Sequence, residues 1–346
     1  MTPRVLVGIV TYNSAPYLKH CLDSVRAQTY RDHVISIWDN ASADESFGIA
    51  QGYGGALVAV QRSGHNIGFC AAQNRLIAAM PSDYVLVLNP DVVLEQSFLE
   101  IMVCALEEDG QAGSATGKLW RWQTDAAQGA IGGAPFSKEI LDTTGIYFTP
   151  NQRHLDRGSG ERDRGQYEAR EYLFGASGAA AFFRRAMLEE VRTGNEYFDE
   201  DFFAYREDAD LAWRAQWLGW RCLYVPEARG FHVRRVLPER RAALPAVINM
   251  HSFKNRFLLR IKNMDAATYA RFFLPITLRD LAALGYVLLR EPASLRALPL
   301  LCKAFPHAWA QRKALRNRRR ITTRDMRSWF SSKPVARPAH RLDSRK

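Results

Sequence analysis

Short apolar runs alternate with amphipathic segments along residues 4–108. The runs Arg4–Val10, His33–Trp38, Ala56–Gln61 and Tyr84–Leu88 have the length and composition of strands. Tyr84–Leu88 is apolar throughout, which is typical of a strand covered on both faces of its sheet. The segments after the first, third and fourth runs carry apolar residues at helical spacing. The alternation predicts an α/β fold with a mostly parallel sheet flanked by helices.

The same rhythm returns later in the chain after an interruption. Residues 120–170 are rich in Gly, Gln, Thr and Arg and predict a long excursion with short strands, of the kind that forms lids and binding loops. A strand is then expected at Ala179–Phe183, with a helix directly after it. A second helix should begin near Glu207 and end at Gly219, followed by a last strand at Arg221–Val225.

Charge divides the chain into an acidic body and a basic tail. The net charge of the whole chain is +11. From residue 236 onward, 24 basic and 6 acidic residues give +18, whereas residues 1–235 carry 23 basic and 30 acidic residues, or −7. We therefore expect a catalytic domain over 1–235, with halves of about 1–118 and 119–235, and a basic helical extension over 236–346.

The extension has an amphipathic pattern. Residues 271–290 are apolar but are interrupted by Pro275, Arg279 and Asp280, so they are too broken to span a bilayer and suit its interface. An anionic membrane surface is the predicted partner of the extension. The alternative is a set of ordinary helices that cover the sheet with solvated basic faces. A disordered end is expected at 331–346.

The cysteines and the N-terminus indicate a compartment. Five cysteines are scattered without a CxxC pair, which argues against a disulfide framework or zinc knuckle and fits a reducing environment. The first residues lead directly into a strand-like run rather than a signal peptide. We expect a cytoplasmic protein, peripheral on the inner face of the cell membrane.

Polar side chains follow the predicted strands at the edge where α/β proteins bind ligands. Asp39 follows the second strand, and Asp91 follows Pro90, which must end the strand before it. Asp91 could simply cap the next turn. Together with His232, it could also form a mixed oxygen and nitrogen pair for Mn²⁺ or Mg²⁺.

Glu207 and Asp208 open a predicted helix, where the helix dipole favours ionised carboxylates. Simple charge placement is one interpretation. The other is that one carboxylate deprotonates an acceptor hydroxyl while its neighbour anchors substrate hydroxyls. The chain has no Walker lysine motif, no GxGxxG and no GxSxG, which excludes the usual ATPase, dinucleotide-binding and serine-nucleophile classes.

Over about residues 4–265 the chain resembles bacterial family 2 glycosyltransferases of the inverting GT-A fold, which is Rossmann-like, and especially their rhamnosyltransferase-like branch. No single motif is specific, but seven in this order are. They are Val7–Asn13, Trp38–Ser42, His65–Asn74, Leu88–Asp91, Gly175–Ala179, Phe198–Leu211 and Gly230–His232.

The resemblance implies a donor site. Asp39 looks like the aspartate that binds the pyrimidine base. Asn89–Pro90–Asp91 stands where the family has its DXD motif, with Asn in place of the first Asp, so Asp91 looks like a metal ligand and His232 like the second. The remaining donor-site residues implied by the family are Thr11, Tyr12 and Asn13 around the nucleoside and Asn66, Gly68 and Asn74 over the ribose and diphosphate.

The resemblance also implies roles late in the chain. Asp208 looks like the general base of an in-line displacement, with Glu207 as the runner-up and Asp210 as a structural residue. Many relatives have small residues after the histidine, where this chain has Arg234 and Arg235, which could bind a phosphate.

The implied function is transfer of a sugar from a nucleotide-diphosphate donor, best dTDP-rhamnose, to a cell-envelope glycan or polyprenyl-diphosphate-linked acceptor. A UDP- or GDP-hexose donor and a sugar-nucleotidyltransferase of similar fold are the alternatives. Nucleic acid is not an expected partner, because the aromatic residues of the tail follow an amphipathic stripe instead of forming stacking platforms.

Overall fold

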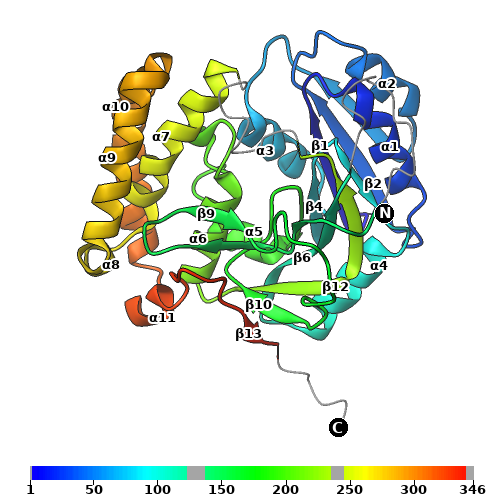
Figure 1. Ribbon diagram of the computed structural model, residues 1–346. Coiled ribbons are helices and arrows are strands. Elements are labelled where there is room, and N and C mark those ends of the chain that lie inside the picture. Colours follow the sequence, from blue (N-terminus) through cyan, green and yellow to red (C-terminus); the bar gives the residue numbers. More distant parts are fainter. Residues whose placement is uncertain (1, 123–136, 235–244, 340–346) are drawn as a thin grey trace.

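One mixed sheet with helices on both faces forms the centre of the computed structural model, which describes residues 2–122, 137–234 and 245–339 (Figure 1). The strands of this sheet are β1 (Val5–Thr11), β2 (His33–Asp39), β3 (Val58–Arg62), β4 (Tyr84–Leu88), β5 (Val92–Leu94), β6 (Ala112–Arg121), β7 (Leu141–Thr143), β10 (Glu171–Leu173), β11 (Ala180–Arg184), β12 (Arg221–His232) and β13 (Arg337–Pro338).

The strand order is β13-β10-β12-β6-β11-β4-β1-β2-β3, with β5 added to β12 and β7 to β6. Strands β4, β1, β2 and β3 are parallel neighbours, and β6 is parallel to β12. Strand β11 runs antiparallel between β4 and β6. The predicted mostly parallel sheet flanked by helices is confirmed. Because β1, β2 and β4 end at the same edge, the polar segments that follow them lie together.

Helices cover both faces of the sheet, and a second small hairpin pairs β8 (Ile146–Phe148) with β9 (His154–Asp156). The helices are α1 (Ala15–Arg26), α2 (Ser46–Tyr53), α3 (Phe69–Ala79), α4 (Phe98–Glu108), α5 (Arg185–Val191), α6 (Glu207–Trp217), α7 (Ala246–Asn263), α8 (Ala266–Arg271), α9 (Phe273–Arg290), α10 (Ala297–Arg316) and α11 (Thr323–Arg327).

The core follows the alternation of side chains along the strands. In β1, Leu6 belongs to one buried cluster, whereas Val7 and Ile9 belong to the cluster on the other face. The cluster that contains Leu6 continues into the helical extension, through Leu258 of α7 and Ala308 of α10. The extension is therefore packed onto the sheet-containing part of the chain through a shared core.

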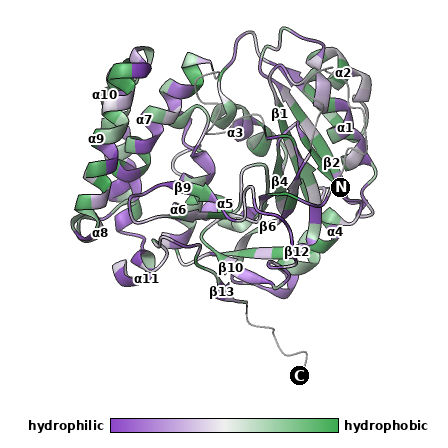
Figure 2. Cartoon of the chain, viewed as in Figure 1, coloured by the Kyte–Doolittle hydropathy of each residue, from purple (hydrophilic) through white to green (hydrophobic). Residues whose placement is uncertain are grey.

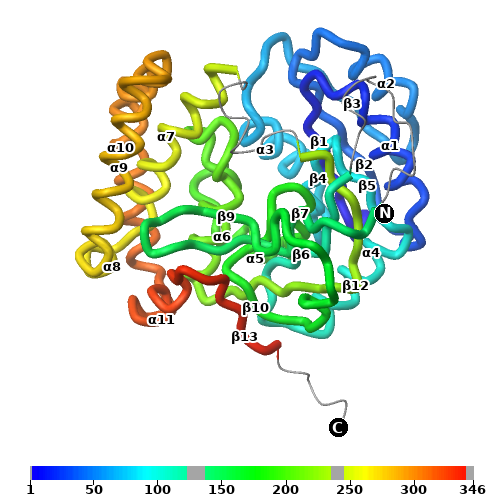
Figure 3. Tube along the Cα trace, viewed as in Figure 1, coloured from blue at the N-terminus to red at the C-terminus, as the bar shows by residue number. Residues whose placement is uncertain are grey.

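The predicted helical C-terminal extension is present. Helix α7 lies between the rest of the molecule and the outer pair α9 and α10, as the ribbon and the tube both show (Figures 1 and 3). Pro275, which interrupts the apolar pattern, lies in the first turn of α9, where a missing amide hydrogen is tolerated. The expected disordered end is ordered as far as Arg337–Pro338, which pair with β10, and 340–346 lie outside the described residues.

Strand β6 was not expected, because its sequence mixes small and polar residues although all but the last are buried. Gly117 explains part of this composition, since a β-carbon there would lie 2.2 Å from the carbonyl oxygen of Ala228. That carbonyl belongs to an irregularity between Val225 and Arg229, after which β12 continues to His232 instead of ending at Val225 as expected. Helix α2 and strand β5 were also missed.

Candidate active site

Asp39 is the buried acid of the first part of the site. It ends β2 opposite Thr11 at the end of β1. Its Oδ2 accepts a hydrogen bond from the Ser42 amide at 3.1 Å and lies 3.2 Å from Nε of Arg62. Its Oδ1 is buried and has no hydrogen-bond partner among the described residues. An unpartnered buried oxygen is suited to accept a hydrogen bond from a ligand.

The loops after β1 and β2 fix each other through backbone and side-chain contacts. Asn13 has a φ of 50°, its amide donates to Oγ of Ser42 at 3.0 Å, and its Oδ1 accepts from the Ala43 amide at 2.8 Å. Tyr12 stands between these anchored residues with 49% of its surface exposed. The two loops therefore form a rigid rim from which the Tyr12 ring projects.

The segment before α3 approaches the late part of the chain closely. Gly68 has a φ of 89°, and a β-carbon there would lie 2.6 Å from the Phe203 ring. Oδ1 of Asn66 accepts from the Gly68 amide at 2.9 Å. Asn74 is buried, and its amide group binds the backbone of Tyr197 and Phe198. Asn74 thus joins α3 to the segment before α6.

Strand pairing brings Asp91 and His232 together. Strand β5 pairs antiparallel with the end of β12, and His232 lies opposite Val92. The amide of Asn89, at the end of β4, donates to the Ala179 carbonyl at 2.9 Å. Nε2 of His232 lies 3.3 Å from Oδ1 of Asp91. That oxygen is buried and accepts no hydrogen bond in the described part of the chain.

Asp142 orients His232 from behind. Its buried Oδ2 lies 2.7 Å from Nδ1 of His232. A carboxylate on Nδ1 orients the imidazole so that Nε2 can bind a metal ion, which would displace the proton from that nitrogen. Burial lowers the pKa of His232, but the Asp142 and Asp91 carboxylates outweigh it and raise the pKa to about 10. Burial opposes ionisation of Asp142, yet His232 and Arg234 hold its pKa well below the usual range.

Arg234 is committed to protein carboxylates. Its Nε donates to Asp142 at 2.6 Å and its Nη1 to Asp156 at 2.8 Å. The guanidinium group of Arg234, which we expected to bind a phosphate, is therefore already bound to two carboxylates. Arg235, its expected partner in that role, lies outside the described residues.

Among the described residues, two groups of side chains have the chemistry of a cation site. Asp91 and His232 point one oxygen and one nitrogen at the same space, a donor set that suits Mn²⁺ or Mg²⁺. The second group is Asp199, Asp201 and His307. There, Lys262 already lies 2.7 Å from Oδ2 of Asp199. The first group therefore fits a divalent cation better than the second.

Glu207 and Asp208 begin α6 and differ in their surroundings. Oδ2 of Asp208 accepts a hydrogen bond from the Gly178 amide at 3.1 Å and lies 3.8 Å from Nε2 of His154. Oε2 of Glu207 is buried without a hydrogen-bond partner in the described ranges. Burial and the Asp208 charge raise the pKa of Glu207 to about 8. Glu207 therefore keeps its proton at neutral pH.

The chain reaches α6 through a strained segment. Phe203, Tyr205 and Arg206 have φ values of 65°, 71° and 70°, which disfavour residues with a β-carbon. Asn255 of α7 holds this segment by donating from Nδ2 to the carbonyls of Phe202 at 2.9 Å, Ala204 at 2.9 Å and Tyr205 at 2.7 Å. The His251 ring stacks on Phe203 with centroids 4.5 Å apart. Helix α7 therefore shapes the segment that presents Glu207 and Asp208.

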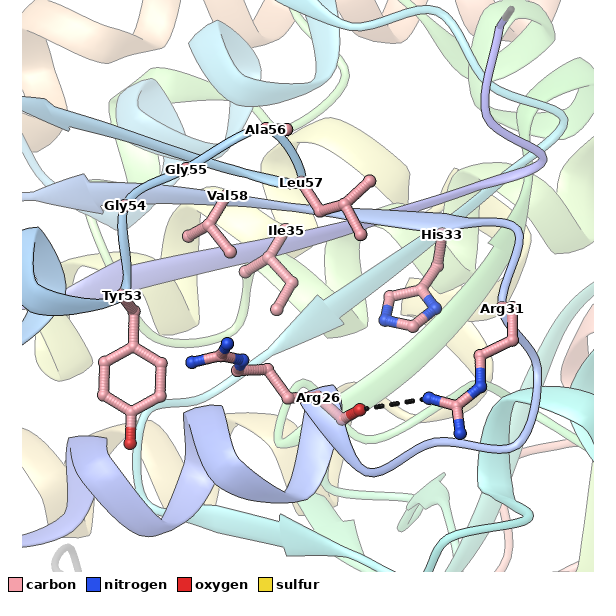
Figure 4. Close-up of a pocket in the computed structure, with 10 residues that line it drawn as sticks. All are labelled: Arg26, Arg31, His33, Ile35, Tyr53, Gly54, Gly55, Ala56, Leu57 and Val58. Atoms are coloured by element: carbon pink, nitrogen blue, oxygen red, sulfur yellow. Dashed lines mark hydrogen bonds between the residues drawn. The ribbon is translucent and has the colours of Figure 1, made fainter.

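A pocket in Figure 4 lies elsewhere on the sheet. It is lined by His33 and Ile35 at the start of β2, by Leu57 before β3 and by Tyr53 at the end of α2. Asp39 stands at the other end of β2. This pocket thus opens on the opposite edge from the candidate site.

The parallel edge that carries Asp39, Asp91 and His232, joined to the helix that carries Asp208, defines a GT-A type fold. The sequence profile described as "Glycosyl transferase family 2" matches residues 6–192. Because this match spans more than half of the chain, the chain belongs to glycosyl transferase family 2.

Two curated relatives share part of the sequence. Glycosyltransferase GlyA of Streptococcus pneumoniae serotype 4 is 26% identical over 149 residues, which are 42% of this chain and 21% of GlyA. The putative glycosyltransferase EpsH of Bacillus subtilis is 29% identical over 105 residues, 30% of each chain. The matched segments thus span less than a third of the length of either relative.

Solved structures share the fold at low identity. Mannosyltransferase PcManGT from Pyrobaculum calidifontis, solved with GDP-Man and Mn²⁺, superposes with a TM-score of 0.50 at 18% identity, covering 95% of this chain and 83% of its own. TarS 1–349 of S. aureus gives 0.52 at 17% identity, covering 92% and 87%. At these identities the superpositions show a shared fold and nothing more.

Proposed function

We propose that the protein is an inverting glycosyltransferase that moves a sugar from a nucleoside-diphosphate sugar to an acceptor hydroxyl with the help of a divalent cation. The observation that carries the proposal is the convergence of Asp91 Oδ1 and His232 Nε2, 3.3 Å apart, with Asp142 fixing the imidazole. PcManGT and GalNAc-T7, which share the fold, were solved with Mn²⁺ and a nucleotide or nucleotide sugar.

Each side of the candidate site has its own task in this proposal. Mn²⁺ or Mg²⁺ held by Asp91 and His232 would neutralise the charge that develops on the departing diphosphate. The unpartnered Oδ1 of Asp39 suits the base of the nucleotide. The other residues proposed to line the donor are Thr11, Tyr12, Asn13, Asn66, Gly68 and Asn89. Asn74 supports this wall from behind, since its amide is hydrogen-bonded to the Tyr197–Phe198 backbone.

Asp208 is the better general base of the two neighbouring acids. A general base must be ionised when the acceptor hydroxyl arrives. Glu207 has a pKa raised to about 8 and holds its proton at neutral pH. Asp208 accepts a hydrogen bond from the Gly178 amide at 3.1 Å, which holds its carboxylate in place at the start of α6. The protonated carboxyl group of Glu207 suits a hydrogen-bond donor, either to the acceptor substrate or to Asp208.

Binding of nucleotide sugars tests the proposal directly. Calorimetry would measure the affinity of the purified chain for dTDP-rhamnose, UDP-hexoses and GDP-hexoses, with and without Mn²⁺. We expect one of them to bind, best dTDP-rhamnose, and the Asp91→Asn variant to lose the effect of Mn²⁺. Absence of binding to every donor in wild type, with and without metal, would overturn the proposal.

We further propose that α9 and α10 rest on an anionic membrane surface. Within the described residues, no helix is long and apolar enough to cross a membrane. Leu278 and Leu281 of α9 are 59% and 61% exposed, and apolar residues follow both helices in Figure 2. The basic residues of the extension match anionic headgroups. The exposed apolar residues of the two helices are Phe273, Leu274, Leu278, Leu281, Leu284, Tyr286, Leu288, Leu289, Leu298, Leu300, Phe305 and Trp309.

Sedimentation with vesicles tests this surface. Wild type should bind vesicles of phosphatidylcholine with phosphatidylglycerol, and Leu281→Glu should weaken binding. Leu57→Glu is a matched control, because Leu57 is also 61% exposed but lies beside β3. If Leu281→Glu and Leu57→Glu bind the vesicles equally well, α9 and α10 do not form the membrane-binding surface. If wild type binds neutral phosphatidylcholine vesicles as well as anionic ones, the basic residues do not contribute to binding.

A further inference from the structure

Five arginines gather where the β8–β9 hairpin, the start of α6, α7 and α9 meet. They are Arg153, Arg206, Arg256, Arg260 and Arg279.

Several contacts place these arginines together. His154, next to Arg153, lies 3.8 Å from Asp208, which is two residues after Arg206. Asn255, next to Arg256, donates to the Tyr205 carbonyl at 2.7 Å. The pair Arg260–Asp280, with 2.6 Å between Nη2 and Oδ2, joins α7 to α9 next to Arg279. Positive charge from four separate segments of the chain therefore converges on one place.

Among the described residues, Asp208 lies near Arg206 and Asp280 lies near Arg279. Asp280 pairs with Arg260. The Nη1 atoms of Arg206 and Arg279 are buried and have no hydrogen-bond partner in the described part of the chain. Burial and the charges of Arg256 and Arg279 lower the pKa of Arg206 to about 9, and burial with Arg256 and Arg153 lowers that of Arg279 to about 10. Both guanidiniums stay protonated at neutral pH and repel each other, so an anion between them would be stabilised.

The position of the cluster indicates which anion it takes. Arg206 lies near Asp208, which deprotonates the acceptor in the proposed reaction, and Arg153 is next to His154, which is 3.8 Å from Asp208. On the other side, Arg279 sits in α9 between Leu278 and Leu281, which are exposed. A ligand that reaches from Asp208 across the arginines therefore meets an apolar surface next. The donor diphosphate belongs at Asp91 and His232 instead.

We infer that the arginines of this cluster bind the phosphate or diphosphate of a lipid-linked acceptor, whose apolar chain continues along α9. Guanidinium groups bind phosphate oxygens in bidentate geometry, and several of them can share a diphosphate. This inference rests on the proposed function for the identity of Asp208 as the base. The cluster itself consists of residues to which that function assigns no other task.

Farnesyl diphosphate is a probe that has both chemical features. Its binding to the full chain would be measured by calorimetry without divalent metal, next to farnesol and inorganic pyrophosphate. We expect farnesyl diphosphate to bind best, and Arg279→Gln and Arg153→Gln each to weaken it about tenfold, the loss of one charge-assisted contact. Arg290→Gln is the control, since Arg290 is exposed at the end of the same helix. Thermal unfolding shows whether Arg279→Gln is folded, and Arg153→Gln changes an exposed loop residue only.

The outcomes separate this inference from the proposed function. Asp91→Asn should abolish the metal-dependent binding of nucleotide sugar and leave farnesyl diphosphate binding unchanged. If nucleotide sugars fail to bind but farnesyl diphosphate binds through Arg153 and Arg279, the proposed function falls and the anion site stands. If farnesol binds as well as farnesyl diphosphate, or both arginine variants bind the diphosphate like wild type, the anion site is wrong. Loss of farnesyl diphosphate binding in Asp91→Asn would place the probe in the donor site and also overturn the inference.

Discussion

The loops after β1 and β2 hold their polar side chains with local contacts, whereas the residues around Asp208 and His232 are held by distant parts of the chain. Asp39 accepts from the Ser42 amide three residues later. His232 depends on Asp142, which is 90 residues away in sequence. The segment before α6 depends on Asn255, 50 residues after Tyr205.

This difference has a functional reason in the proposed reaction. A donor nucleotide has fixed dimensions, and short loops at a parallel sheet edge can hold it with few residues. The base and the acceptor must be placed against that donor from a second direction. In this chain, helix α7 supplies that second direction by fixing the strained segment from Phe203 to Arg206.

Replacing Asp208 by Asn should have the largest effect, and this effect should be on the rate of sugar transfer and not on donor binding. Loss of the general base is expected to lower the rate of sugar transfer about 10²- to 10⁴-fold, while the donor affinity stays near wild type. Steady-state kinetics and calorimetry with the donor that binds best would measure the two quantities separately.

The opposite pattern is expected for Asp39→Asn. This variant should bind the donor more weakly and keep much of its rate at saturating donor, because Asp39 lies on the nucleotide side. If Asp208→Asn loses donor affinity instead, Asp208 belongs to the donor site and the division into two sides is incorrect.

The local side of the comparison could be predicted from the sequence. The runs at Tyr84–Leu88 and His33–Trp38 identified strands, and parallel strands place the polar residues that follow them at one edge. On the distant side, Asp91 and His232 were predicted as a cation pair from their chemistry, and the family resemblance implied the same role. The pairing of β5 with β12 now gives the reason for their approach.

The rest of the distant side could not be predicted. No spacing connects Asp142 with His232, or Asn255 with the carbonyls of Phe202 to Tyr205. Strand β6 pairs with β7, which contains Asp142, and with β12, which contains His232. Its composition is mixed partly because the Ala228 carbonyl packs against Gly117. Such contacts depend on tertiary packing that overrides the local pattern.

Replacing Lys262 by Met should lower the free energy of unfolding, because Lys262 holds together the segment before α6 and α6 itself. Nζ of Lys262 lies 2.7 Å from Asp199 and 2.9 Å from Asp210, and all three side chains are almost fully buried. Without the ammonium group of Lys262, two buried carboxylates lose this partner, and the free energy of unfolding should fall by about 3–5 kcal/mol. Denaturant unfolding would measure this loss. The exposed Lys303→Met is the control on α10, and an equal loss in both variants would contradict the role of the buried ion pairs.

Replacing Asp142 by Asn should weaken metal binding without removing a metal ligand. Asp142 fixes the imidazole of His232 through Nδ1, so the affinity for Mn²⁺ should fall about 10- to 100-fold. Asp156→Asn provides a matched control, because Asp156 also pairs with Arg234 but has no hydrogen bond to His232 among the described residues. Similar Mn²⁺ affinities of the two variants would show that Asp142 acts only through Arg234.

The smallest expected effect concerns Glu207 and pH. The folded chain holds the proton of this acid up to about pH 8, whereas the ordinary value is 4.5, so between these values the native state binds more protons than the unfolded state. Stability should therefore decline as pH rises through this interval and level off above it. Glu207→Gln should flatten the decline of the melting temperature between about pH 5 and about pH 9, by on the order of a few degrees. The exposed Glu45→Gln should retain the wild-type slope, and an unchanged slope in Glu207→Gln would mean that Glu207 ionises near its ordinary value in the folded chain.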